Sequence, residues 1–279
     1  MRILIISINY APELTGIGKY NAEMAEWLVK QGHEVTIITA PPYYPEWRVG
    51  QGYSAWKYQQ ERLSGVDIWR CPVWVPSRPG GLKRLLHLAS FALSSLPVML
   101  RHVFWKPDVV LAIEPPLMCA PSALLVARLC GAQAWLHIQD FEVDAAFDLG
   151  ILRAERLKRW VLLIERFLLR RFDQVSTISD KMLEKLNSKG VLPDKIFSFP
   201  NWVDLKDIHP LNTPGNFRSQ LGILPGQLVA LYSGNMGATC AARWPSPIRA
   251  PTRRARTASS TSCSVPGTIS MRDTQCSAR

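Results

Sequence analysis

Apolar and polar residues follow two different periods over the first forty residues. The apolar run at residues 3–8 predicts a buried strand, and residues 33–39 predict a second one. Between them, apolar residues recur at helical spacing over residues 17–31, and Gly32 is placed to end the helix in a left-handed conformation. Strand, helix and strand in this order predict a βαβ unit at the start of the chain.

The same alternation continues to about residue 200. It indicates an α/β fold, a doubly wound parallel sheet in a Rossmann-like domain over residues 1–200. Pro97 is expected to break or bend one of the predicted helices. Besides a hairpin of residues 57–61 and 66–71, we predict strands at residues 107–113, 133–138, 173–178 and 195–199, and helices at residues 83–102, 122–130, 152–171 and after Asp180.

The chain changes character after residue 200. We interpret residues 201–238 as a linker and the start of a second α/β domain, of which only the first strand, at residues 228–235, is present. Residues 239–279 show neither a helical nor a strand period, so we expect a basic, disordered tail there.

Two glycines lie where the first predicted strand turns into the first helix, in Thr15-Gly16-Ile17-Gly18-Lys19. Glycine lets the backbone approach a ligand closely, and a helix start offers unpaired N–H groups and a positive dipole to an anion. We therefore expect a phosphate-bearing ligand at the carboxyl edge of a parallel sheet. A tight turn without a ligand is the alternative.

Two common nucleotide-binding patterns are incomplete in this chain. Asn21 stands where a dinucleotide-binding loop would have its third glycine, and the second strand ends at residues 39–42 without an acid for the ribose. These departures argue against a dinucleotide dehydrogenase. The sequence also lacks G-x-x-x-x-G-K-[ST], which excludes a P-loop nucleoside triphosphatase.

Positive charge is concentrated at the end of the chain. The net charge of +11 by itself suggests a nucleic-acid or anionic-membrane partner. Residues 239–279, however, hold seven Arg, no Lys and one acidic residue, a net charge of +6, which leaves only +5 for the other 238 residues. We therefore expect no nucleic-acid partner for the body of the protein.

Targeting and cysteine patterns favour a cytoplasmic protein. The six cysteines show no C-x-x-C spacing, so neither a zinc site nor a dithiol motif is indicated. The N-terminus has no signal-peptide pattern, and no stretch reaches the about 18 uncharged apolar residues that span a membrane.

Some segments suggest contact with lipid or sugar. Residues 152–171 predict a basic amphipathic helix, and residues 83–102 an apolar helix with basic ends, so an anionic membrane surface is one interpretation, with the protein peripheral on the inner face of the plasma membrane. Helices that simply cover a sheet can have the same composition. Aromatic residues within residues 43–74 can likewise stack on sugars or simply pack against the sheet.

Six short motifs occur once each, in a specific order, over residues 1–238. They are Asn9-Tyr10-x-Pro12-Glu13-x-Thr15-Gly16-Ile17-Gly18-Lys19-Tyr20, Gly32-His33-Glu34-Val35, Thr39-Ala40-Pro41-Pro42-Tyr43-Tyr44-Pro45, His137-Ile138-Gln139-Asp140, Phe199-Pro200-Asn201-Trp202 and Tyr232-Ser233-Gly234-Asn235. In these motifs the chain resembles glycosyltransferases of family 4, with the GT-B architecture of two facing Rossmann-like domains. Among them it is similar to transferases of colanic acid biosynthesis.

The resemblance implies a retaining transfer of a sugar, a hexose or fucose, in exopolysaccharide assembly. The donor would be a GDP- or UDP-linked nucleotide sugar, the acceptor a lipid-linked oligosaccharide, and no metal or other cofactor would be needed. By resemblance, His137 is the catalytic residue near the donor sugar, although a lone histidine is more often a packed core residue. The donor-phosphate candidates are Gly16, Gly18, Gly234 and Asn235, and the acceptor candidates are Thr15, Lys19, Glu114, Asp140 and Asp144.

The end of the chain departs from the family pattern. The family has a basic residue soon after the Ser-Gly-Asn turn and two glutamates, seven residues apart, that hold the donor sugar and ribose. Residues 239–279 contain no lysine and no glutamate. We interpret them as a shifted reading frame in place of the native donor domain; a genuine basic tail that binds nucleic acid or membrane is the competing interpretation.

Two further functional classes stay open on the sequence. One is an acceptor- or lipid-binding domain without catalysis, and the other is a different nucleotide-binding α/β protein. Vesicle binding in the absence of nucleotide would favour the lipid-binding domain. Calorimetry with NAD and with nucleoside diphosphates would distinguish a different nucleotide-binding protein from a glycosyltransferase.

The tail and the missing glutamates give a first prediction. Deleting residues 239–279 is expected to leave vesicle and nucleic-acid binding unchanged, and a marked loss of either would show that the tail is functional.

The purified 279-residue chain is expected to transfer little or no sugar, because half of the donor site is absent. Measurable turnover of a nucleotide sugar would contradict this expectation.

Overall fold

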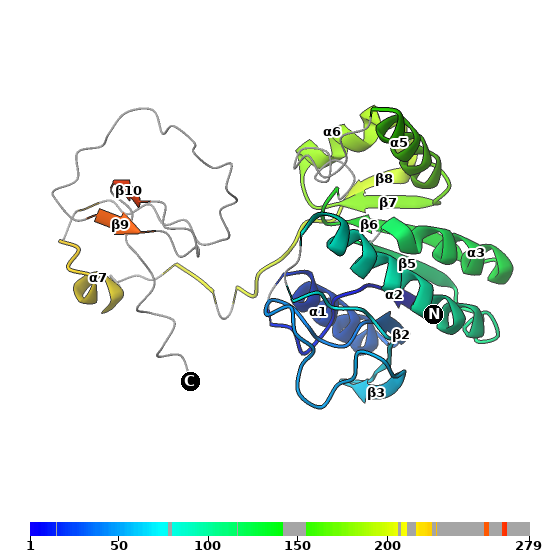
Figure 1. Ribbon diagram of the computed structural model, residues 1–279, viewed down its shortest axis with the longest axis horizontal. Coiled ribbons are helices and arrows are strands. Elements are labelled where there is room, and N and C mark those ends of the chain that lie inside the picture. Colours follow the sequence, from blue (N-terminus) through cyan, green and yellow to red (C-terminus); the bar gives the residue numbers. More distant parts are fainter. Residues whose placement is uncertain are drawn as a thin grey trace. The chain divides into compact units, whose positions relative to one another are not determined.

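A mostly parallel sheet forms the centre of Met1–Asp204 (Figure 1). In the described part of these residues it has eight strands, in the order β3-β4-β2-β1-β5-β6-β7-β8. Neighbouring strands are parallel, except that β3 is antiparallel to β4. The strands are β1 (Arg2–Ile6), β2 (Glu34–Thr39), β3 (Gln59–Leu63), β4 (Val66–Arg70), β5 (Val109–Glu114), β6 (Gln133–Ile138), β7 (Gln174–Thr177) and β8 (Ile196–Ser198).

The structure is a computed structural model. It describes residues 1–14, 16–77, 80–115, 117–141, 155–205, 208–210, 216–224, 227, 254–256 and 264–266. The chain divides into two units, Met1–Asp204 and Leu205–Arg279.

Helices cover both faces of the sheet, which confirms the predicted α/β class and the doubly wound arrangement (Figure 1). Side chains alternate along each strand, so Ile3 and Ile5 join the core under α1, whereas Leu4 and Ile6 join the core under the other helices. The first face carries α1 (Ile17–Lys30). The second carries α2 (Gly81–Arg101), α3 (Ala120–Cys130), α5 (Glu155–Leu169) and α6 (Asp180–Ser188), and short 3-10 turns lie at η1 (Leu117–Cys119) and η2 (Pro193–Lys195).

Residues with positive φ make the turns between these elements. Ser64 and Gly65 have φ values of 52° and 85°, and two successive positive values define the hairpin turn whose twist matches that of the flanking strands. The predicted hairpin is therefore confirmed as β3–β4. Gly32 and Gly131, with φ of 84° and 68°, follow the last turns of α1 and α3, as their positions after those helices predicted.

Pro97 does not interrupt its helix. Of the expected break or bend, the break does not occur, because α2 continues through Pro97 to Arg101. Proline lacks the N–H that would bond the carbonyl of Leu93, one turn earlier. Pro97 and Leu93 both lie on the exposed side of α2, so water can reach this carbonyl and the missing bond is tolerated.

The described backbone of Leu205–Arg279 contains little regular structure. It includes α7 (Asn216–Gln220) and a short antiparallel pair, β9 (Arg254–Arg256) with β10 (Ser264–Pro266). These two strands are the described part of the predicted tail, and three-residue strands are too short to give a period in the sequence. The strand predicted at residues 228–235 lies outside the described residues.

None of the helices in the described ranges is both long enough and apolar enough to cross a bilayer.

Candidate functional site

The glycine turn lies between β1 and α1, at the carboxyl edge of the sheet. Gly16 is the N-cap residue of α1, with φ 63° and ψ −146°, a conformation that only glycine adopts readily. No side chain bonds to the N-terminus of this helix, and its first turn contains no acidic residue. Among the described residues no side chain caps this helix start, so its first N–H groups can bond to another acceptor.

Glu13 explains why the second glycine is needed. Its buried carboxylate accepts hydrogen bonds from the backbone N–H groups of Tyr43 and Tyr44 and from Nδ2 of Asn9, each at 2.9 Å. A Cβ at Gly18 would lie 2.9 Å from Oε2 and 3.0 Å from Cβ of Glu13, closer than real contacts allow. Gly18 thus lets α1 pack against the carboxylate that joins this turn to the loop after β2.

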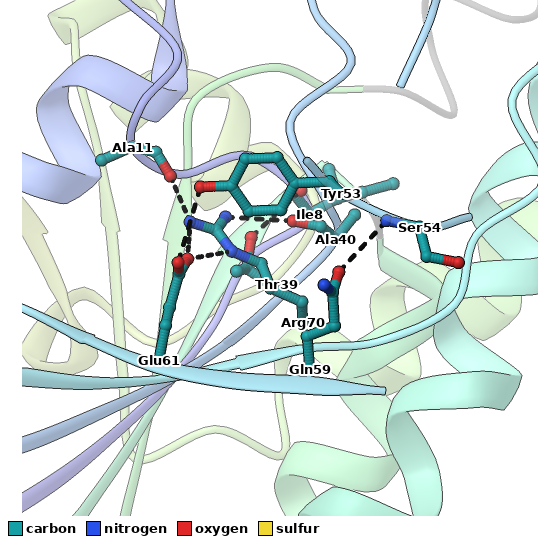
Figure 2. A network of polar contacts seen from close by, with 9 residues as sticks. All are labelled: Ile8, Ala11, Thr39, Ala40, Tyr53, Ser54, Gln59, Glu61 and Arg70. Atoms are coloured by element: carbon teal, nitrogen blue, oxygen red, sulfur yellow. Dashed lines mark hydrogen bonds and ion pairs between the residues drawn. The ribbon is translucent and has the colours of Figure 1, made fainter. Parts of the chain in front are cut away.

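Arg70, at the end of β4, holds the segment that precedes the glycine turn (Figure 2). Its buried guanidinium donates to the carbonyls of Ala11, at 2.5 Å, and Ala40, at 3.1 Å. Its Nε donates to Oε1 of Glu61 on β3 at 2.7 Å, and the ring of Tyr53 lies 5.2 Å from the guanidinium carbon. One side chain thereby connects the hairpin, the end of β2 and the loop that leads to Gly16.

His137 lies near the end of β6, and both of its ring nitrogens have partners. Nδ1 is 2.9 Å from Oγ of Ser176 on β7, and Nε2 is 3.0 Å from Nε2 of Gln139. Because an amide nitrogen donates, Nε2 of His137 accepts and its Nδ1–H donates to Ser176. Gln139 and Asn201 exchange two further hydrogen bonds of 3.0 Å, which tie β6 to the segment after β8.

The environment of His137 keeps the ring neutral. The side chain is 3% exposed, and burial lowers its pKa to about 4. The ring also packs edge-on against Phe199, with the centroids 5.2 Å apart. A neutral imidazole suits hydrogen bonding to a hydroxyl, and a sugar hydroxyl that bound Nε2 would replace Gln139 there.

The other predicted site residues are spread along this edge. Lys19 lies in the first turn of α1, where its half-exposed ammonium is 3.7 Å from Glu23. Glu114 is the buried last residue of β5, and Asp140 is exposed directly after β6. The structure therefore brings the glycine turn, Lys19, Glu114, His137 and Asp140 to the carboxyl edge. Thr15, Asp144, Gly234 and Asn235 lie outside the described residues.

Several residues that build this edge were not predicted as site residues. Glu13, Gln139 and Asn201 stand inside the motifs quoted above, so the motifs contained a signal for them. Arg70 gave no signal, because an arginine in an edge hairpin is usually solvated. Trp202 also joins the site: its Nε1–H donates to Glu23 at 2.6 Å and fixes the segment after β8 to α1.

Fold and edge together define a Rossmann-like α/β protein with a glycine turn before a helix N-terminus at the carboxyl edge of its sheet. Residues 15–202 match the family model described as a glycosyl transferase 4-like domain. The chain belongs to this glycosyltransferase family. It is 47% identical over 242 residues to the colanic acid biosynthesis glycosyl transferase WcaI of Escherichia coli (strain K12). This match covers 85% of the chain and 59% of WcaI, so the chain spans about three fifths of that relative's length.

Solved structures similar to this chain include sucrose-phosphate synthase of Thermosynechococcus elongatus. It is 13% identical, with a TM-score of 0.46 over 74% of this chain and 92% of that one. HepE of Anabaena, solved in complex with UDP-glucose, is 13% identical with a TM-score of 0.45 over 80% of this chain and 50% of that one.

The buried neutral His137 gives a pH prediction. The pKa is about 4 in the folded protein and about 6.5 when unfolded, so its contribution to stability is full above pH 6.5 and is lost as the pH falls towards 4. The shift corresponds to a loss on the order of 3 kcal/mol. His137→Gln is expected to lose less unfolding free energy between pH 7 and about 4.5 than the parent chain, as measured by urea unfolding.

The matched control is His33→Gln, at the half-buried residue directly before β2. This variant should retain the parent's loss of stability. The same loss in the His137 variant and in the parent would contradict the assignment of a neutral, buried ring.

Proposed function

We propose that this chain carries the acceptor-side domain of a retaining glycosyltransferase. The enzyme would transfer a sugar, a hexose or fucose, from a GDP- or UDP-linked donor to a lipid-linked oligosaccharide in the assembly of colanic acid or a similar exopolysaccharide. Membership of the glycosyl transferase 4-like family and the 47% identity to WcaI support this proposal. Retention, independence of metal and the low activity expected of the 279-residue chain rest on the family resemblance.

The open N-terminus of α1 is the observation that carries the proposal. Its first-turn N–H groups lack a side-chain cap, Gly16 leaves the approach open, and Lys19 adds a half-exposed positive charge to the same turn. A diphosphate is the anion that best satisfies such a site. Gly16 and Gly18 would therefore face the donor diphosphate, with Gly234 and Asn235 contributing from the second domain.

The acceptor would lie along the rest of the same edge. Glu114 ends β5 and Asp140 follows the neighbouring parallel strand β6, and their carboxylates would accept hydrogen bonds from sugar hydroxyls. Thr15 and Asp144 complete the set by resemblance. His137 would lie near the donor sugar, with its neutral ring held by Ser176 and Gln139.

Reversing the charge in the first turn of α1 tests the donor site. Lys19→Glu is expected to weaken GDP and UDP binding about tenfold, because it places a negative charge beside the diphosphate. NMR titration suits weak binding by a single domain, and the amide signals of Gly16 and Gly18 should move in the parent chain.

Lys30→Glu is the matched control, because it makes the same change of charge at the other end of α1. It should leave the affinity close to that of the parent. Equal weakening by both variants, or no movement of the two glycine signals with either nucleotide, would contradict the donor site.

Exposed apolar side chains on α2, α3 and α5 support contact with a lipid surface. Leucines 82, 86, 93 and 100 form one exposed stripe along α2, and Leu125 and Leu129 are exposed on the neighbouring α3. On α5, Trp160, Leu163, Ile164 and Phe167 are exposed among arginines 159, 166 and 170. Such a mixture of apolar and basic groups matches an anionic bilayer surface, which is where a lipid-linked acceptor would be found.

Introducing a charge into the α2 stripe tests this surface. Leu93 is 72% exposed, so Leu93→Glu should fold normally and sediment several-fold less with phosphatidylglycerol-containing vesicles than the parent chain. Leu63→Glu, in the exposed hairpin, is the control and should sediment like the parent. Unchanged sedimentation of the Leu93 variant would contradict a role of this surface in lipid binding.

Vesicle binding in the absence of any nucleotide binding would favour a lipid-binding domain without catalysis.

A further inference from the structure

A cavity of about 510 Å³ lies beside the C-terminal end of α2, on the α2 face of the sheet. Its floor is formed by Asp67 and Trp69 of β4, with Gln60 of β3 next to them. Arg101 ends α2, and Phe104 and Trp105 follow it. The volume lies within the range of about 300–1,000 Å³ that is usual for small-molecule sites.

This cavity shares no residue with the glycine turn or the His137 network. The turn after α2 is joined to the amino end of β1, because Nη1 of Arg2 donates to the carbonyl of Trp105 at 2.9 Å. The glycine turn follows the carboxyl end of the same strand. The two places therefore lie at opposite edges of the sheet.

Aromatic contacts hold the walls of the cavity in place. The buried ring of His102 lies edge-on between the indoles of Trp69 and Trp105, with both centroid distances 6.0 Å. Nδ1–H of His102 donates to the carbonyl of Val98 at 2.7 Å, which fixes the ring on α2. The guanidinium of Arg101 lies over the Trp69 ring at 5.0 Å. Both indoles and one cationic donor are thus preorganised.

Phe104 is presented to solvent on a well-bonded turn. Its side chain is 89% exposed. Hydrogen bonds from the N–H of Phe104 to the carbonyl of Arg101, at 3.3 Å, and from that of Trp105 to His102, at 3.1 Å, continue the turns of α2. Lys106 then takes a left-handed conformation, with φ 55°. A large aromatic ring held outside the core in this way is accessible to a ligand in the neighbouring cavity.

We propose that this cavity is a second saccharide-binding site, one that holds a neutral oligosaccharide. The apolar C–H faces of pyranose rings can stack on aromatic rings such as Trp69, Trp105 and Phe104. Asp67, Gln60 and Arg101 supply planar acceptors and donors for the hydroxyl groups at the ring edges. Aromatic surfaces with a few polar groups around them match the chemistry of a sugar.

The charges in the cavity favour a neutral ligand over a nucleotide. Asp67 has a half-exposed carboxylate, 3.6 Å from Arg62, and it would repel a phosphate. Asp67 and Arg101 are the charged residues that line the cavity, and their charges are opposite in sign. Saccharide binding in this cavity does not depend on a transfer reaction, and it is independent of the proposed donor site.

Binding of defined trisaccharides to the full chain tests the proposal. Maltotriose, cellotriose and mannotriose are titrated at millimolar concentrations while tryptophan fluorescence and NMR indole signals are followed. At least one is expected to bind saturably, with movement of the Trp69 and Trp105 indole signals. Phe104→Ala and Asp67→Asn should each weaken that binding at least about tenfold, which corresponds to about 1.4 kcal/mol.

Leu192→Ala is the control, because Leu192 is also an exposed apolar residue and does not line the cavity. It should bind like the parent, and saturating UDP should not displace the trisaccharide. The proposal is overturned if no trisaccharide binds saturably. It is also overturned if binding persists unchanged in both cavity variants, or if UDP competes with it. Neither cavity substitution removes a buried side chain, so circular dichroism should show that both variants fold.

Discussion

The structure at the carboxyl edge depends on one buried cation. Arg70 has almost no contact with solvent, and its charge is compensated by Glu61 and by two backbone carbonyls. Removing one partner of a buried ion pair leaves an uncompensated charge, which costs more than the pair gains. The hairpin, the end of β2 and the loop before Gly16 are therefore linked, and the glycine turn cannot move without disturbing this charge.

This linkage gives the edge a fixed shape before any ligand arrives. Glu13 joins the glycine turn to Tyr43 and Tyr44, and Gln139 joins β6 to Asn201. These described polar groups bond to one another, whereas the N-terminus of α1 has no side-chain cap. A site built in this way spends little conformational entropy on binding, because its backbone is already ordered.

Strong periodicity made most of the strands and helices of residues 1–200 predictable. The β3–β4 hairpin could also be predicted from adjacent residues, because Ser64 and Gly65 form its turn. The site was harder, because its bonds join distant positions. Arg70 meets Ala11 across 59 residues, and Gln139 meets Asn201 across 62. No local pattern encodes such pairs. His137 could be chosen from its place at a strand end, but its neutral state comes from burial, and its ring is held by Ser176, 39 residues later.

The two outer strands of the sheet also determine how the domain behaves among its own copies. A free strand edge can pair with another chain, and long apolar edges promote aggregation. Here β3 exposes Gln60 and Arg62, and β8, at the opposite edge, is only three residues long. Addition of a further strand would therefore desolvate a charged group at one edge and gain few hydrogen bonds at the other. The hairpin that carries Glu61 to Arg70 also keeps the sheet from growing beyond its own chain.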